Sequence, residues 1–361
     1  MSTKLRVALL GLEHPHSNSW QLAFRESAGA EFVGIWSQTP GLAKEKSVQY
    51  GCDAWEDRDA LIDYSDAVAI CSPTAQHREL IEIAARQGKK VLCEKPIAGT
   101  LEDCRRIETV VNETGAYYMQ GFPKRFDPVN TEIKKIVDSG ELGIIFLVRI
   151  RHGHPFAAID SEFRQSWFAD LKQACGGALL DEGVHIADFI RWLFGEPEKV
   201  SCVVNHMVAG LEVEETATAL FRFGNGLIAE ITSSWHFLSA ENSVEIYGSN
   251  GSLVLSGVDL GSRDLTREGY LKYYIRPCRE TGESNPSVEL KNRSWQISKT
   301  IPQFKQDTDV FHQNVARAFV DFAAKGKAPP VTLKDGIRAV EMILSAYRAA
   351  ESGQTENVVF G

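Results

Sequence analysis

Apolar and polar positions follow two different rhythms along the chain. Over residues 1–122, short apolar runs alternate with amphipathic stretches of helical spacing, a pattern that predicts parallel strands joined by crossover helices. Because these runs are continuously apolar, both faces of the sheet are expected to be covered. The predicted strands are LRVALLG, EFVGIW, DAVAICS, KKVLCE and AYYMQG. We therefore predict a doubly wound α/β domain in this region.

The pattern changes after residue 122. The stretch 142–154 (LGIIFLVRIRHGH) alternates as a half-buried strand does, and 178–195 (ALLDEGVHIADFIRWLFG) predicts a helix. Further strand-like runs follow without helices between them, and FGNG at 223–226 favours a hairpin turn. These runs are KVSCVVNHMV, ETATALFRF, LIAEITSSWHF, SVEIYG and SLVL. Residues 123–361 are therefore predicted to form an α+β domain with a mostly antiparallel sheet.

The last hundred residues divide into two parts. Residues 257–300 are polar with weak periodicity, so we expect a long excursion there. Two helices are predicted near 307–325 and 335–352, and they are candidates to pack back on the first domain.

Composition restricts the partners and the compartment. The chain has 361 residues, 43% hydrophobic and 24% charged, which is typical of a soluble globular protein of two domains. A net charge of −9 without a basic run argues against nucleic acid, and no apolar run is long enough for a membrane span or a signal peptide. Its seven scattered cysteines suggest free thiols in a reducing compartment. We therefore expect a cytoplasmic protein.

Residues 93–99 (CEKPIAG) follow the fourth predicted strand. In open α/β sheets, ligands bind outside the carboxyl ends of the strands, where Pro96 would restrain Lys95. Partial burial could lower the pKa of this lysine and make it a proton donor or acceptor. The alternative is a surface lysine paired with Glu94.

Asp181 and His185 lie four residues apart in the helix predicted over 178–195. That spacing places both on one helix face, where the carboxylate would orient the imidazole and raise its pKa. The alternative is a polar patch in which His185 only satisfies local hydrogen bonds.

Residues 72–77 (SPTAQH) follow the third strand and could offer hydroxyls and N–H groups to a ribose or phosphate, or could simply cap a helix. The histidine pairs His152/His154 and His14/His16 suggest metal binding. No acidic cluster with recognisable ligand spacing accompanies them, so we predict no metal site.

The loop GLEHPHSNSW, residues 11–20, follows the first strand, where a dinucleotide-binding protein carries G-x-G-x-x-G. Gly11 is in place, but Glu13 and His16 stand where the other two glycines belong. A carboxylate at position 13 would oppose the pyrophosphate unless it turns away. Because His14, His16 and Ser17 sit at a predicted helix N-terminus, the loop still favours an anion. We interpret it as a modified cofactor loop.

Taken together, these segments and their order resemble the Gfo/Idh/MocA family of NAD(P)-dependent oxidoreductases. The resemblance spans nearly the whole chain, and its most specific part is E-K-P after a strand combined with G-G-x-x-x-D-x-G-x-H-x-x-D. It implies an N-terminal Rossmann domain, and a C-terminal α+β domain whose open sheet forms a dimer or tetramer. It also implies hydride transfer between a nicotinamide cofactor and a carbon of a sugar, glycoside or cyclitol.

The resemblance assigns roles to particular residues. His185 would take the hydroxyl proton as general base, Lys95 would stabilise charge on the same oxygen, and Asp181 would position the substrate and His185. The candidate catalytic residues are Lys95, Asp181 and His185. The candidate cofactor-binding residues are Gly11, Leu12, Glu13, His14, His16, Ser37, Ser72, Pro73, Thr74, His77, Glu94, Lys95, Pro96 and Trp167.

Two further departures from the family pattern concern the cofactor. NAD enzymes commonly carry an acid at the end of the second strand, where this chain has Ser37 and Gln38. Lys44 or Lys46 could then meet a 2′-phosphate, so NAD and NADP both stay open. Trp167 is retained, but Phe168 replaces an arginine that relatives often carry.

Three functions are compatible with the sequence. The first is a dehydrogenase with an exchanging cofactor, and the second is a redox-neutral enzyme that retains NAD(H) while it catalyses elimination, epimerisation or glycoside cleavage. The third is a non-catalytic dinucleotide- or sugar-binding protein. The altered loop favours the third, whereas the intact set of Lys95, Asp181 and His185 argues against it.

Overall fold

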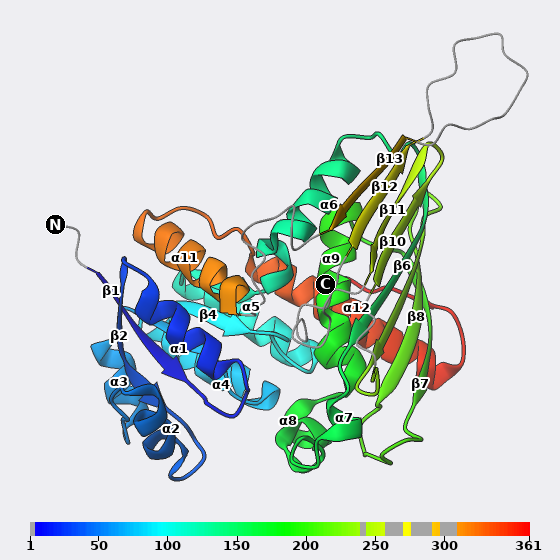
Figure 1. The fold of residues 1–361 in the computed structure, drawn as a ribbon. Coiled ribbons are helices and arrows are strands. Elements are labelled where there is room, and N and C mark those ends of the chain that lie inside the picture. Colours follow the sequence, from blue (N-terminus) through cyan, green and yellow to red (C-terminus); the bar gives the residue numbers. More distant parts are fainter. Residues whose placement is uncertain (1–3, 239–242, 257–269, 276–290, 297–308) are drawn as a thin grey trace, which may run out of the picture.

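A computed structural model describes residues 4–238, 243–256, 270–275, 291–296 and 309–361. Two β-sheets lie side by side with helices packed between them (Figure 1). One of these helices, α12 (Leu333–Ser352), contacts both β5 of the first sheet and β7 of the second. The two sheets confirm the predicted fold class, a parallel α/β sheet followed by an α+β part.

The first sheet has five parallel strands in the order β2-β1-β3-β4-β5. They match the five strands predicted from the apolar runs: β1 (Leu5–Leu10), β2 (Ala30–Trp36), β3 (Ala67–Ile70), β4 (Lys90–Glu94) and β5 (Tyr118–Gly121). The order reverses between β1 and β3, which is where a doubly wound sheet opens a crevice for ligands.

Helices cover both faces of this sheet. They are α1 (Ser17–Glu26), α2 (Leu42–Tyr50), α3 (Arg58–Tyr64), η1 (Thr74–Gln76), α4 (His77–Arg86) and α5 (Leu101–Thr114). A late helix, α11 (Asp309–Ala324), packs against α1, and its Phe319 joins the same apolar cluster as Trp20 and Phe24. The first sheet therefore takes part of its core from the end of the chain.

The second sheet has nine strands in the order β13-β12-β11-β10-β6-β9-β8-β7-β14, antiparallel except for the parallel pair β6–β9. Its strands are β6 (Ile145–Gly153), β7 (Lys199–Asn205), β8 (Thr216–Arg222), β9 (Ile228–Ser234), β10 (Ser243–Gly248), β11 (Gly251–Ser256), β12 (Tyr270–Ile275), β13 (Lys291–Gln296) and β14 (Glu356–Asn357). The predicted excursion over 257–300 is wrong where β12 and β13 extend this sheet; the rest of that region lies outside the described residues.

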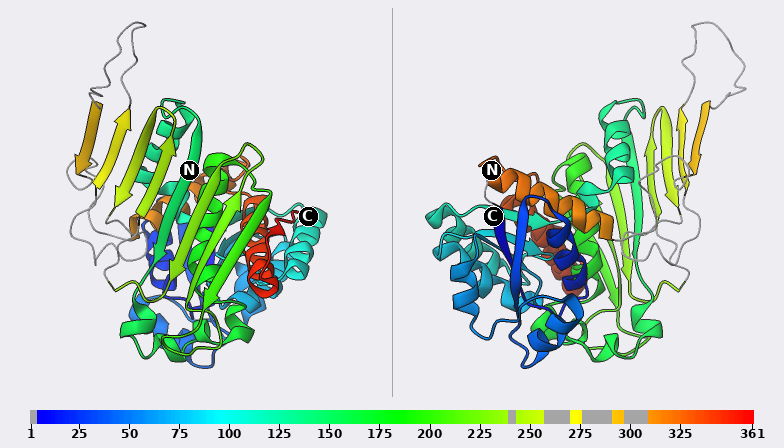
Figure 2. Two further views of the ribbon diagram at one scale, coloured as in Figure 1. Left: turned by 90° about the vertical axis from the view of Figure 1, so that its right-hand side faces the viewer. Right: turned by 60° about the vertical axis from the view of Figure 1, so that its left-hand side comes forward.

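The remaining helices lie between and around the sheets. They are η2 (Pro123–Phe126), α6 (Pro128–Asp138), α7 (Phe156–Ile159), η3 (Phe163–Gln165), η4 (Trp167–Ala169), α8 (Leu171–Ala174), the π-helical turn η5 (Leu179–Gly183) and α9 (Val184–Phe194). Helices, α12 among them, cover one face of the second sheet, and no helix of the described residues covers the other face (Figure 2). Apolar side chains such as Leu220 and Ile228 are exposed on the second sheet. The expected dimer or tetramer stays a prediction.

Two further expectations concern cysteines and membranes. The six cysteines within the described ranges are free thiols, while Cys278 lies outside those ranges. In the part of the chain that the structure describes, no helix combines the length and apolarity needed to cross a bilayer.

Candidate active site

The predicted cofactor-binding residues of the first sheet all follow the carboxyl ends of its strands. Gly11 to His16 follow β1, Ser37 follows β2, Ser72 to His77 follow β3, and Glu94 to Pro96 complete and follow β4. Because these strands are parallel and adjacent, their ends line one edge of the sheet, at the crevice where the strand order reverses.

Gly11 lets the chain turn sharply after β1. Its φ is +83°, and a Cβ built on it would lie 2.4 Å from backbone atoms of Ser72. Only glycine satisfies both the left-handed backbone and this close approach. The first glycine of the fingerprint therefore allows the tight turn that brings the loop after β1 against the loop after β3.

Glu13 turns toward the end of β2. Its Oε1 accepts hydrogen bonds from Ser37 Oγ (2.6 Å) and Thr39 Oγ1 (2.7 Å), and its Oε2 accepts one from the Leu12 N–H (2.8 Å). The carboxylate therefore turns away from the place of a pyrophosphate, the condition under which the loop was expected to bind a dinucleotide.

The rings of His14 and His16 contact each other at the start of α1, with centroids 4.3 Å apart and ring planes tilted by 56°. The His16 N–H donates to His14 Nδ1 at 3.1 Å, so a neutral His14 carries its proton on Nε2. Burial, and then the neighbouring His16, lower the pKa of His14 well below its ordinary value. His14 is therefore a neutral, buried hydrogen-bond donor in the cofactor loop.

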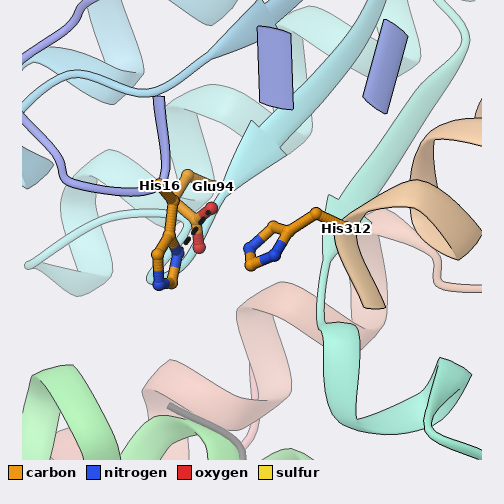
Figure 3. A group of neighbouring side chains, drawn as sticks. All are labelled: His16, Glu94 and His312. Atoms are coloured by element: carbon orange, nitrogen blue, oxygen red, sulfur yellow. Dashed lines mark ion pairs between the residues drawn. The ribbon is translucent and has the colours of Figure 1, made fainter. Parts of the chain in front are cut away.

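The side chain of Glu94 lies close to those of His16 in the cofactor loop and His312 in α11 (Figure 3). Its Oε2 lies 3.3 Å from His16 Nδ1 and accepts a 2.6 Å hydrogen bond from Trp20 Nε1, while its Oε1 accepts from the Lys95 N–H at 3.0 Å. Burial acts to raise the pKa of this carboxyl, but His16, His14 and His312 together outweigh it, so the pKa lies well below its usual value. Glu94 is a buried anion.

His77 ties the loop after β3 to the turn after β4. Its Nδ1 lies 2.7 Å from the Pro96 carbonyl oxygen and its Nε2 lies 3.0 Å from the Ser72 carbonyl oxygen. No side-chain hydrogen bond caps η1, whose first residue is Thr74 with Pro73 before it. The structure therefore does not show the simple helix cap that was the alternative for this segment.

The Lys95 side chain connects the first part of the chain to the second by pairing with Asp181. Its Nζ lies 2.5 Å from Asp181 Oδ1 and 3.1 Å from the Asp181 carbonyl oxygen, and only 3% of the residue is exposed. Burial acts to lower the pKa of Lys95, but the carboxylates of Asp181, Glu182 and Glu94 outweigh it and the pKa is raised. The lowered lysine pKa that burial alone predicted is therefore wrong, as is the surface pair with Glu94. Lys95 is a buried cation.

Asp181 does not orient His185 as the four-residue spacing predicted. The Asp181 carboxylate instead contacts Lys95 and accepts a 3.1 Å hydrogen bond from Trp235 Nε1. Asp181 lies in the π-helical turn η5 and His185 in α9. Because π bonding runs from i to i+5 and widens the turn, residues four apart no longer lie one above the other. Lys95 holds the pKa of Asp181 well below its usual value against the opposing effect of burial.

His185 is buried, and its Nδ1 has no hydrogen-bond partner among the described residues. Burial, followed by the charges of Lys95 and His152, lowers the pKa of His185 well below its ordinary value. The expected rise in the pKa of this imidazole is wrong, because the Asp181 carboxylate pairs with Lys95 instead of with His185. A neutral imidazole next to a cation can accept a proton.

A second group of buried side chains surrounds this centre and was not assigned from the sequence. His152 Nε2 lies 2.6 Å from Glu182 Oε2, and His154 Nε2 lies 3.7 Å from Glu182 Oε1 and 3.9 Å from Asp181 Oδ2. The histidine pair on and after β6 was noted, but the acids that meet it come from a distant turn. His154, Asp181 and Glu182 therefore form a potential metal-ligand group that local spacing could not reveal.

Trp167 bridges the second part of the chain to the cofactor loop. Its Nε1 donates to the Glu13 carbonyl oxygen at 3.1 Å, and Phe168 packs its ring 5.3 Å from that of His14. Both aromatic residues, with Thr74, Pro96 and Asp181 among others, line a small cavity of about 10 Å³. The cavity lies where the cofactor edge and the Lys95–Asp181 pair meet.

Comparison with known proteins identifies the class. Residues 5–122 match the model of an oxidoreductase family with an NAD-binding Rossmann fold, and residues 130–254 match the GFO/IDH/MocA C-terminal domain. The chain therefore belongs to the Gfo/Idh/MocA oxidoreductase family, and its first domain is an NAD-binding Rossmann domain, as predicted.

Individual relatives agree with this assignment. The uncharacterized oxidoreductase YrbE of Bacillus subtilis (strain 168) is 33% identical over 319 residues, covering 84% of this chain and 83% of its own. The inositol 2-dehydrogenase of Rhizobium meliloti (strain 1021) is 29% identical over 255 residues, covering 68% and 74%. A structure of levoglucosan dehydrogenase with NADH and levoglucosan shares the fold, with a TM-score of 0.84 at 22% identity over 99% and 100% of the two chains.

Proposed function

We propose that this protein oxidises a hydroxyl-bearing carbon of a sugar, glycoside or cyclitol and passes the hydride to a nicotinamide cofactor. The observation that carries the proposal is the buried centre in which a cationic Lys95, paired with Asp181, stands close enough to a neutral His185 to depress its pKa. Relatives named as inositol and levoglucosan dehydrogenases support this substrate class.

Each residue of the centre has one task. His185 accepts the proton of the substrate hydroxyl, and it can do so because burial and Lys95 keep it neutral at pH 7. Lys95 donates a hydrogen bond to the same oxygen and stabilises the negative charge that develops as the proton leaves. Asp181 fixes the Lys95 ammonium group and balances its charge. The bound nicotinamide ring supplies the acceptor for the hydride released from the carbon.

The cofactor edge of the first sheet fits a dinucleotide. Gly11 opens the turn after β1, Trp167 holds the loop backbone from the other side, and Ser72 and Thr74 lie at the end of β3. These groups face the crevice at the reversal of strand order, the usual place for a dinucleotide in this fold.

The test is a turnover assay on the purified full chain. Myo-inositol, glucose and levoglucosan are each incubated with NAD⁺ or NADP⁺, absorbance at 340 nm is followed, and Lys95→Ala and His185→Gln are run in parallel. The proposal predicts substrate-dependent reduced cofactor with the wild type and a large loss with both variants. Reduction that persists unchanged in both variants would remove this centre from the chemistry.

Two alternatives are separated by the cofactor content of freshly purified protein. A stoichiometric dinucleotide that survives purification, with no net reduction of added NAD⁺, would indicate the redox-neutral reaction. Failure to bind any dinucleotide would leave only a sugar-binding role.

A further inference from the structure

Two departures from the dinucleotide fingerprint face each other in the fold. The second glycine after β1 is replaced by Glu13, and the acid that NAD-binding folds carry at the end of β2 is replaced by Ser37. In the chain these positions are 24 residues apart. In the structure the Gly11 N–H donates to the Trp36 carbonyl oxygen at 2.8 Å, so the ends of β1 and β2 are adjacent.

Three hydrogen bonds fix the Glu13 carboxylate, two from residues after β2 and one from its own loop. Ser37 Oγ and Thr39 Oγ1, both immediately after β2, donate to Oε1 at 2.6 and 2.7 Å, and the Leu12 N–H donates to Oε2 at 2.8 Å. A carboxylate has about four acceptor positions, two on each oxygen. Oε1 already accepts two hydrogen bonds and Oε2 accepts one, so an open position remains on Oε2. The residue is only partly buried.

We propose that Glu13 takes the place of the missing acid of β2 and selects NAD over NADP by accepting a hydrogen bond from the adenosine ribose. The inference rests on the proposed function, because it needs a dinucleotide in this crevice. A ribose with free hydroxyls donates to a carboxylate, whereas a 2′-phosphate would bring a second negative charge against it.

Within the described ranges, the Glu13 carboxylate is hydrogen-bonded to two hydroxyls and one backbone N–H, all of them uncharged groups. Lys46, a sequence candidate for meeting a 2′-phosphate, instead bonds Gln49 Oε1 at 3.1 Å on its own helix. The end of β2 therefore presents a negative charge supplied by the neighbouring loop.

Two other roles for Glu13 make different predictions. If the carboxylate only held the loop in shape, its loss would weaken NADH and NADPH binding by the same factor. If it opposed the pyrophosphate, its loss would strengthen both by the same factor. Only contact with the adenosine ribose changes the ratio of the two affinities.

The experiment measures the dissociation constants of NADH and NADPH for the full chain by fluorescence titration. The wild type is expected to prefer NADH by at least about 100-fold, and Glu13→Gln, which keeps the side-chain shape, should reduce the preference to below about ten-fold. Glu45→Gln, which removes an exposed acid from the first turn of α2, is the matched control and should leave the ratio unchanged.

A second variant, in which the acid is moved from the loop to β2, controls for a loss of binding caused by misfolding. We call it the relocation variant. Glu13→Gly combined with Ser37→Asp returns the glycine to the loop and the acid to β2, and it should restore the preference for NADH that Glu13→Gly alone loses. An unchanged ratio in Glu13→Gln, or a relocation variant without preference, would overturn the inference while the proposed function stands. A wild type that binds neither dinucleotide would overturn both.

Discussion

The loop after β1 and the turn after β4 both follow buried parallel strands, yet they carry their charged groups differently. Lys95, after β4, reaches out of the first sheet and pairs with Asp181 from the second part of the chain. Glu13, after β1, turns back to Ser37 within the same sheet. At β4 the charged side chain therefore connects two separate regions of the chain, whereas at β1 it connects two neighbouring loops of one sheet.

The largest expected effect comes from removing the cation at the β4 end. Lys95→Ala should lower kcat by at least about 100-fold, since the developing charge on the substrate oxygen loses its donor. It should also lower the free energy of unfolding by about 3–5 kcal/mol, because Asp181 is left buried without its partner. Turnover assays and denaturant unfolding measure the two effects.

The double variant Lys95→Ala/Asp181→Asn separates these two consequences. It removes the buried carboxylate charge, so much of the stability should return while turnover stays low. Recovery of turnover in this variant would show that Lys95 acts only through the fold.

The pH dependence of kcat/KM sharpens the assignment of His185. A general base must be unprotonated, so activity rises with pH through the pKa of its free form. Because burial and then Lys95 lower the pKa of His185 well below its ordinary value of 6.5, the acid limb should fall well below that pH. The raised pKa of Lys95 keeps the alkaline limb above 10.5. An acid limb centred at or above pH 6.5 would contradict the neutral, buried imidazole.

Two glycines with the same backbone conformation isolate the close approach at the β1 end. Gly11→Ala and Gly41→Ala both place a side chain at a φ near +80°, which costs about 1–2 kcal/mol of folding free energy. Only Gly11 lies against another loop, so its variant should lose about 1–3 kcal/mol more through overpacking against Ser72. Gly11→Ala should also weaken NADH binding, and equal unfolding energies for the two variants would remove the clash from the account.

The smallest effect is expected where Trp167 contacts the loop at the β1 end. Trp167→Phe removes the hydrogen bond to the Glu13 carbonyl oxygen and should cost about 1 kcal/mol of stability. Trp55→Phe, which removes a similar bond to the Val33 carbonyl oxygen, is the control. NADH affinity should fall with Trp167→Phe and stay constant with Trp55→Phe. A fall in both would mean that Trp167 acts through general stability.

Much of the fold follows from local pattern. The five parallel strands are continuous apolar runs, and the later strands alternate or follow turn signals, so periodicity located them. Strands β12 and β13 were missed because their region is polar and weakly periodic. The pairing of β12 with β11, and of β13 with β12, places them in the sheet, and pairing is a tertiary property.

The sequence indicated which residues belong to the candidate site, but not which of them pair with one another. Lys95, Asp181 and His185 were identified from motifs, whereas the pairing of Asp181 with Lys95 depends on a π-helical turn that spacing does not reveal. The direction of the Lys95 pKa shift depends on three carboxylates, two of which, Asp181 and Glu182, come from a distant segment. For Glu13, the sequence left open whether the carboxylate opposes a pyrophosphate or turns away, because its partner Ser37 is adjacent only in the fold.

The central claim is that one dinucleotide spans the crevice from Glu13 to Lys95. A crystal structure of the full chain with NADH tests it directly. The account predicts the adenosine ribose within hydrogen-bond distance of the Glu13 carboxylate and the nicotinamide ring beside Lys95 and His185. A dinucleotide bound away from this edge, or with its ends exchanged, would contradict the account.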